Sequence, residues 1–148
     1  MQLRPATADD FTAIVQLLQE TGIGTEDLNP AHTAAFLLLS EGAEILACGA
    51  VERFNGRCGV VRSVAVRAPQ RGQGLATRLM RSLETHARLR GQERLYLLTE
   101  SAAGFFARLG YVRCEWSEVP EAVRESGPFS RQACAQATCM EKRLSEEV

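Results

Sequence analysis

The sequence predicts a mixed α/β (α+β) fold built around one sheet. In the middle of the chain, two strand-like runs at 45–54 and 58–67 flank Asn55-Gly56, a dipeptide that favours a two-residue β-hairpin turn. The apolar residues then change to helical spacing over 75–87, and a Val-rich strand leads into that helix. Strands with helices inserted between them are typical of a sheet covered by helices.

Capping and turn residues predict the remaining elements. Thr7 suits a helix N-cap because its hydroxyl can accept a first-turn N–H, and Gly22 can end that helix in a left-handed conformation. Ser101 and Gly110 bracket a second, short helix in the same way. Further strands are expected over 2–4, 36–39, 94–99, 111–117 and 138–144.

Length and charge restrict the class of protein. The 148 residues suit one hydrophobic core, so a single domain over 1–148 is expected. Lys and Arg number 17 and Asp and Glu 18, and the net charge of -1 argues against a nucleic-acid partner, which needs a basic surplus. The chain has neither a basic segment leading into a long apolar run nor a stretch long enough to span a bilayer, so neither a signal peptide nor a membrane partner is expected.

Cysteine and histidine usage favours a reduced, metal-free protein in the cytoplasm. Cysteines number five, and an odd count without a secretion signal favours free thiols. His32 and His86 are isolated, so no metal site is expected. Cys114, Cys134 and Cys139 could bind a soft trivalent arsenical, but small buried apolar packing is the more frequent use of free cysteine.

The turn between the strand at 63–66 and the long helix carries the clearest functional pattern. Its residues are Arg71-Gly72-Gln73-Gly74-Leu75-Ala76. Glycines let backbone N–H groups approach a phosphate, and the first N–H groups of a helix have no internal partner. With the helix dipole and the charge of Arg71, they predict an anion site, the alternative being an ordinary strand-to-helix turn. The turn lacks the Gly-Lys-Ser/Thr ending of a Walker loop and the spacing of a dinucleotide fingerprint.

Two motifs together resemble those of a known family. Arg71-x-x-Gly74-x-Ala76, after the 63–66 strand, resembles the acetyl-CoA motif of the GNAT N-acetyltransferases, and 97–99 with 105–111 resembles that family's second motif. The resemblance implies acetyl-CoA as co-substrate and a mostly antiparallel central sheet of about six to seven strands, with a splayed central strand pair and flanking helices. It also implies that the strand backbone contacts the pantetheine arm and that the amides of the turn contact the pyrophosphate. The cofactor-binding residues so implied are Val64, Ala65, Val66, Arg71, Gly72, Gln73, Gly74, Leu75, Ala76 and Phe106.

The C-terminal part of the chain resembles a narrower group. The segment 119–123, Ser126-x-x-Phe129 and the run 134–144 are similar to GNAT members found with arsenic-resistance operons. This similarity implies a small acceptor, for which an arsenic-containing amino acid is one candidate. The chain also departs from the family, because Phe106 stands where many members carry a tyrosine that reprotonates the leaving thiolate.

Candidate catalytic and substrate-binding residues lie on the predicted strands. Glu52 interrupts an apolar strand and is a candidate general base for the acceptor amine, with a solvated, arginine-paired carboxylate as the alternative. Glu100 is a second candidate, or a helix N-terminal acid. Arg62 interrupts a Val-rich run and can clamp a substrate carboxylate with its bidentate fork, unless it forms an internal ion pair with a strand neighbour. Ser63 is a further substrate-binding candidate.

Three hypotheses follow for the function. The leading one is direct transfer of an acetyl group from acetyl-CoA to a primary amine of a small molecule. A non-catalytic sensor that binds acyl-CoA or a metalloid is the second, and a protein N-acetyltransferase is the third. Small domains of this type often dimerise through sheet edges or C-terminal strands, so a homodimer is one candidate assembly.

Overall fold

The protein is described by a computed structural model that covers residues 1–54, 57–125, 129 and 135–144. The predicted Asn55-Gly56 turn, and Ser126 and Cys134 of the C-terminal similarity, lie outside these described residues. The chain forms two compact units, Met1–Val51 with Arg62–Thr85 and Glu52–Val61 with His86–Val148.

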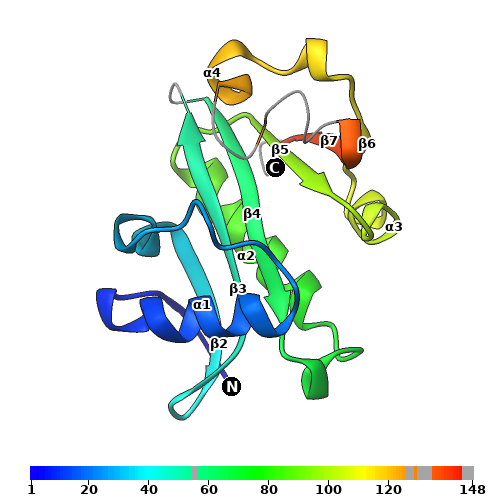
Figure 1. The fold of residues 1–148 in the computed structure, drawn as a ribbon. Coiled ribbons are helices and arrows are strands. Elements are labelled where there is room, and N and C mark those ends of the chain that lie inside the picture. Colours follow the sequence, from blue (N-terminus) through cyan, green and yellow to red (C-terminus); the bar gives the residue numbers. More distant parts are fainter. Residues whose placement is uncertain (55–56, 126–128, 130–134, 145–148) are drawn as a thin grey trace. The chain divides into compact units, whose positions relative to one another are not determined.

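The described strands form one sheet in the order β1-β2-β3-β4-β5-β7-β6 (Figure 1). The strands are β1 (Gln2–Pro5), β2 (Phe36–Glu41), β3 (Glu44–Phe54), β4 (Cys58–Val66), β5 (Arg94–Thr99), β6 (Val112–Arg113) and β7 (Thr138–Arg143). The helices are α1 (Phe11–Glu20), α2 (Leu75–Leu89), α3 (Ala103–Arg108) and α4 (Glu121–Arg124). The pairs β1–β2, β2–β3, β5–β7 and β6–β7 are antiparallel and β4–β5 is parallel, which confirms the predicted mixed, mostly antiparallel sheet with helices.

In the unit Met1–Val51 with Arg62–Thr85, α1 and α2 cover opposite faces of the strands (Figure 1). Successive residues of a strand point to opposite faces, so Cys48 and Ala50 of β3 join the core under α1 whereas Gly49 faces α2. A Cβ on Gly49 would lie 3.1 Å from Leu83 Cδ1 and 3.2 Å from Leu79 Cδ2, so α2 packs closely on the strand there. The core under α1 contains Ile14, Leu17, Leu18, Phe36, Leu38, Ile45, Cys48, Ala50 and Ala65.

In the unit Glu52–Val61 with His86–Val148, β5 pairs with β4 along one edge and with β7 along the other. The parallel register joins 58–60 to 94–96, and the antiparallel register runs from Arg94↔Arg143 to Thr99↔Thr138. Every second β5 side chain therefore faces the same core, which contains Val60, Tyr96, Cys114, Val119, Val123, Phe129 and Cys139.

Two predicted element boundaries are wrong. Ser101 does not begin the short helix: α3 starts after Ala102, whose N–H donates to the Thr99 side chain at 2.9 Å, so the last residue of β5 binds the free amide. The predicted strand 111–117 is reduced to β6. The Glu115 N–H donates to the Glu118 carboxylate at 2.8 Å, and this local bond closes a 3-10 turn in place of a longer ladder.

Arg4 of β1 forms a bidentate ion pair with Asp10, the residue just before α1. Its two terminal nitrogens lie 2.8 and 2.9 Å from the carboxylate oxygens of Asp10, and the Thr7 N–H donates to the same carboxylate at 2.7 Å. The hydrogen bonds from Arg4, assisted by the Thr7 amide, hold the pKa of Asp10 well below its usual range.

Replacing Arg4 with Met is expected to lower the free energy of unfolding by about 1–2 kcal/mol at neutral pH, because Asp10 loses charge-assisted hydrogen bonds. Since the folded-state pKa of Asp10 is depressed, the stabilisation is present above the unfolded-state pKa of about 3.9 and is lost as the pH falls through the folded-state pKa. Urea unfolding at about pH 7 and about pH 3 should therefore show a gap between wild type and Arg4→Met that narrows at the lower pH. An equal gap at both pH values would contradict this assignment.

Candidate active site

The backbone of strand β4 is irregular at Ser63, near the C-terminal end of the strand. Ser63 has φ 57°, a left-handed conformation that costs a non-glycine residue about 1–2 kcal/mol. The Cys48 thiol donates to the Ser63 carbonyl at 3.4 Å, and burial raises the pKa of Cys48 to about 12, so this thiol stays protonated as a donor. After Ser63 the strand continues through half-buried Val64, buried Ala65 and half-buried Val66.

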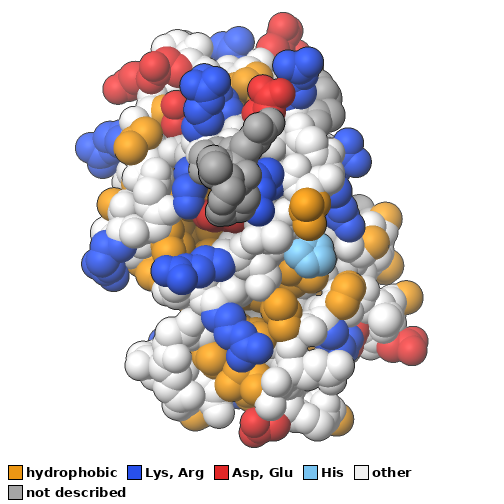
Figure 2. Space-filling view, turned by 180° about the vertical axis from the view of Figure 1, so that it is seen from behind, with side chains coloured by type: hydrophobic (Ala, Val, Ile, Leu, Met, Phe, Trp, Pro, Cys, Tyr) orange, Lys and Arg blue, Asp and Glu red, His pale blue; other side chains and the backbone are white. Residues whose placement is uncertain are grey.

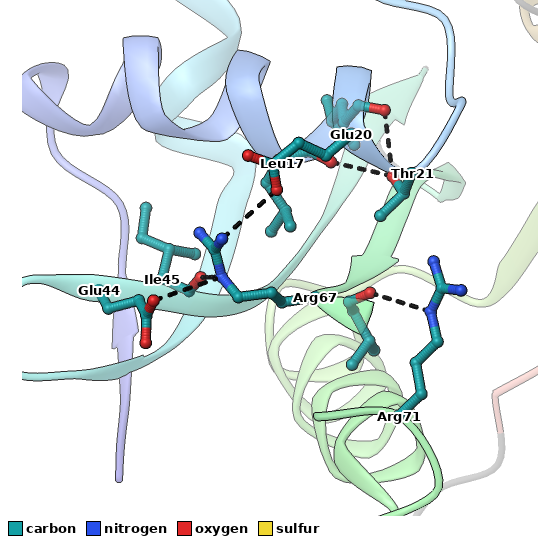
Figure 3. Close-up of polar contacts among 9 residues, drawn as sticks. Leu17, Glu20, Thr21, Glu44, Ile45, Arg67 and Arg71 are labelled. Carbon is teal, nitrogen blue, oxygen red and sulfur yellow. Dashed lines mark hydrogen bonds and ion pairs between the residues drawn. The ribbon is translucent and has the colours of Figure 1, made fainter. Parts of the chain in front are cut away.

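Arg67 follows β4 and contacts both β3 and α1 through its side chain (Figure 3). Its Nε donates to the Ile45 carbonyl of β3 at 3.2 Å, and its Nη1 lies 3.4 Å from a carboxylate oxygen of Glu20 on α1. The same Nε lies 3.7 Å from Glu44, and the Arg67 N–H donates to the Leu46 carbonyl at 2.8 Å. These contacts define the point at which the chain leaves the sheet and enters the turn.

The turn after β4 presents backbone donors at the start of α2. Gly72 and Gly74 have φ values of 82° and 78°, the left-handed region that glycine adopts without strain. A Cβ on either glycine would meet no atom of the described residues within 4 Å, so the space beside the turn is open to these residues. The Gly74 carbonyl accepts the Arg78 N–H at 3.1 Å, and the helical N–H groups that follow Gly74 therefore have no acceptor inside the helix.

The charge around this turn favours an anion. Arg71 is exposed, and its Nε donates to the Val66 carbonyl at 3.3 Å, which holds the guanidinium beside the turn (Figure 3). Helix α2 has 15 residues and no acidic residue in its first turn. Leu75 is buried and anchors the helix start, whereas Gln73 is exposed and Ala76 is small. A cation, open glycine amides and a helix N-terminus together fit a pyrophosphate such as that of acetyl-CoA.

Arg62 and Ser63 lie in the same unit as the turn. Arg62 Nη2 lies 2.7 Å from Asp27 Oδ1, and its Nε lies 3.4 Å from the Ser63 hydroxyl oxygen. The Arg62 side chain is 10% exposed and that of Asp27 is 44% exposed. Arg62 thus forms an internal ion pair, with a partner from the loop after α1. Asp27 could not be predicted as a site residue, because nothing in the sequence marks one acidic loop residue as the partner of an arginine 35 positions away.

Glu52 and Phe106 belong to the other unit. Glu52 is half-buried towards the end of β3. Phe106 of α3 is buried, and its ring packs edge-on against Phe105 and Tyr111, with centroid distances of 5.0 and 5.8 Å. The structure therefore gathers the turn, the end of β4, Arg62 and Ser63 in one unit, and it places Phe106 in the apolar packing of the other.

The described residues were predicted to lack a metal site and a membrane-spanning segment. In the part of the chain that the structure describes, no three His, Cys, Asp or Glu side chains come together as a metal site. Within the same residues, none of the helices combines the length and the apolar character needed to cross a membrane. His32 accepts the Asn29 N–H through Nδ1 at 3.1 Å, and His86 is exposed. Figure 2 shows Lys and Arg side chains scattered over the face that it presents, with Asp and Glu side chains beside some of them at the top.

Comparison with known proteins extends these observations. The chain is 35% identical over 94 residues to N-alpha-acetyltransferase 80 of Mus musculus, covering 60% of this chain and 30% of that protein. It is 34% identical over 109 residues to glucosamine 6-phosphate N-acetyltransferase 1 of Oryza sativa subsp. japonica, covering 73% of this chain and 66% of that protein.

The fold is shared with a solved enzyme structure. N-acetylglutamate synthase from Neisseria gonorrhoeae, complexed with coenzyme A and N-acetyl-glutamate, superposes with a TM-score of 0.85 at 24% identity, over 98% of this chain and 35% of that one. The chain thus spans about a third of the length of N-alpha-acetyltransferase 80 and of the N-acetylglutamate synthase. A model of the acetyltransferase (GNAT) family matches residues 4–111. Because this match spans most of the chain and the fold agrees with it, the protein belongs to the GNAT acetyltransferase family.

Proposed function

We propose that the protein transfers an acetyl group from acetyl-CoA to a primary amine of a small molecule that carries an anionic group. The observation that carries the proposal is the open, left-handed glycine turn with Arg71 at the start of α2. In this proposal, backbone N–H groups from Arg71 to Ala76 bind the pyrophosphate, the backbone of Val64, Ala65 and Val66 pairs with the pantetheine arm, and Phe106 contributes apolar surface.

The acceptor side of the proposal rests on Arg62. A guanidinium that is 10% exposed and already bonded to a carboxylate at 2.7 Å offers the geometry that a substrate carboxylate or phosphate would use. The names of the relatives agree with this chemistry, since glucosamine 6-phosphate and glutamate are both anionic amines. An arsenic-containing amino acid belongs to the same class of anionic amines and is one candidate acceptor. Ser63 adds a hydroxyl next to the arginine.

The proposed reaction is direct transfer, without an acetylated enzyme. Acetyl-CoA supplies the thioester, and this chain positions the amine against it, so that proximity carries most of the rate enhancement. A strand N–H near Val64 would stabilise the negative charge on the carbonyl oxygen, and Glu52 would deprotonate the ammonium through water. Phe106 has no proton to give, so the thiolate leaves as such or is protonated by solvent, which a thiol pKa of about 8.5 makes tolerable.

Acetyl-CoA turnover with a panel of primary amines tests the proposal. The panel contains acidic amino acids, their phosphorus and arsenic analogues, an amino-sugar phosphate, neutral amines and an N-terminal peptide. Release of free CoA that depends on an anionic small amine supports the proposal. Binding of acetyl-CoA with no turnover on any amine would favour the non-catalytic sensor, and turnover with the peptide alone would favour a protein N-acetyltransferase. An acetylated protein trapped without an acceptor would overturn direct transfer.

Replacing Glu52 with Gln is expected to lower turnover most at low pH, where the acceptor amine is protonated and needs a base. The affinity for acetyl-CoA should stay nearly unchanged, because Glu52 is not assigned to the cofactor. A pH profile of kcat/KM, measured beside acetyl-CoA binding for both proteins, checks this. Arg53→Gln, at the exposed neighbouring position of β3, is the matched control and should retain the wild-type profile. A wild-type profile for Glu52→Gln would remove Glu52 as the base.

A further inference from the structure

Two cysteine side chains meet in the core of the unit that contains β5, β6 and β7. The Sγ atoms of Cys114 and Cys139 lie 3.2 Å apart, and the two residues are 8% and 5% exposed. The Cys114 N–H donates to the Cys139 carbonyl at 2.9 Å, which continues the β6–β7 register of Val112↔Glu141 and Arg113↔Met140 by one pair. The two cysteines are therefore direct cross-strand neighbours whose side chains share one face of the sheet.

The environment of Cys114 differs from those of Cys48 and Cys58. The hydrogen bond with the Cys139 thiol lowers the pKa of Cys114. Burial instead raises the pKa of Cys48 to about 12, and it also raises the pKa of Cys58. Since the thiolate is the reactive form of cysteine, the lowered pKa favours reaction at Cys114 over Cys48 and Cys58, and the Cys139 thiol lies within reach of Cys114 for a second step.

We propose that Cys114 and Cys139 form a reversible disulfide when the protein meets a hydroperoxide such as hydrogen peroxide. In the first step the Cys114 thiolate attacks a peroxide oxygen, the O–O bond breaks, and Cys114 becomes a sulfenic acid while the released hydroxide takes up a proton to form water. In the second step the Cys139 sulfur attacks the Cys114 sulfur, the S–O bond breaks, and a second water leaves with the proton of the thiol. Two thiols are thereby oxidised by two electrons, and the peroxide is reduced to two waters.

The geometry requires only a local adjustment. The sulfur–sulfur separation must fall from 3.2 Å to about 2.05 Å, a shift of about 1 Å that side-chain rotation and small strand movements supply. The disulfide would link the residue after β6 to β7 and would enclose residues 115–138, which include α4, in a covalent loop. Such a crosslink stabilises chiefly by restricting the unfolded chain, so the oxidised protein should unfold at a higher temperature.

The test is oxidation of the full chain by hydrogen peroxide, followed by digestion without reductant and mass spectrometry. We expect a peptide pair joined through Cys114 and Cys139, a loss of two titratable thiols, and a Tm raised by roughly 5–10 °C. Dithiothreitol should reverse all three changes. These measurements use the wild-type protein, so their outcome does not depend on whether a cysteine variant folds.

Matched variants identify the pair. Cys114→Ser and Cys139→Ser should each abolish the crosslink and the rise in Tm, whereas Cys48→Ser and Cys58→Ser should retain the crosslink. Three outcomes would overturn the proposal: both thiols remain reduced under conditions that oxidise Cys58, Cys139 is joined to Cys134 instead, or Cys114 is oxidised to sulfinic acid without a crosslink. None of these outcomes bears on acetyl transfer, because neither cysteine is assigned to it.

Discussion

Replacing Gly74 with glutamate is expected to abolish the stabilisation that acetyl-CoA gives the wild-type protein. At about 100 times its Kd, acetyl-CoA should raise the wild-type Tm by roughly 5–10 °C, because a ligand of the native state stabilises it by mass action. Gly74 is left-handed at φ 78° and open on the side where a Cβ would point. The glutamate carboxylate would therefore stand beside the N–H groups of the turn and repel the pyrophosphate, raising Kd by about 100-fold or more.

Two control variants separate charge at the turn from backbone strain. Gly74→Ala introduces the same left-handed strain without the charge, and it should lower the Tm of the free protein while keeping most of the acetyl-CoA shift. Gly42→Glu places a carboxylate at another open, left-handed glycine, φ 60°, in the β2–β3 turn, and it should keep the full shift. Thermal unfolding and calorimetric titration measure both quantities. A full acetyl-CoA shift in Gly74→Glu would remove the turn as the pyrophosphate site.

Replacing Arg62 with Lys is expected to raise the KM for an anionic amine by about tenfold, with a smaller change in kcat. The lysine keeps the positive charge but loses the bidentate fork, so the cost falls on the binding of the carboxylate or phosphate. A neutral amine of similar size makes no use of the fork, and its KM should change much less. Steady-state kinetics with one anionic and one neutral acceptor measure this difference.

Asp27 supplies the matched variant for Arg62. Its carboxylate lies 2.7 Å from the Arg62 guanidinium and occupies part of the fork that a substrate would use. Asp27→Asn removes the competing charge, so the KM for the anionic acceptor should fall while the affinity for acetyl-CoA stays the same. Equal KM increases for anionic and neutral acceptors in Arg62→Lys would show that Arg62 serves only to hold the fold.

The predicted elements that depend on local pattern agree with the structure. The helix predicted from the apolar spacing of 75–87 is observed as α2, and the strand predicted from the Val-rich run is observed as β4. Gly22, predicted to end the first helix, follows α1 with φ 79°. These features are encoded within a few residues, because helix periodicity, strand alternation and left-handed glycines are local properties of the chain. The errors lie at element ends. At the start of α3, for example, the Ala102 N–H donates to the Thr99 side chain of the preceding strand, and Ser101 does not cap the helix.

The glycine turn is the part of the candidate site that can be predicted from the amino-acid sequence alone. The turn contains a basic residue and two glycines and is followed directly by a helix. An anion site needs these features next to one another, so a short stretch of sequence is enough to predict it. Two pairings depend instead on tertiary contacts: Arg62 with Asp27, 35 residues apart, and Cys114 with Cys139, 25 residues apart. Such pairs form because loops and strands from distant positions converge, and the sequence carries no periodicity that connects them.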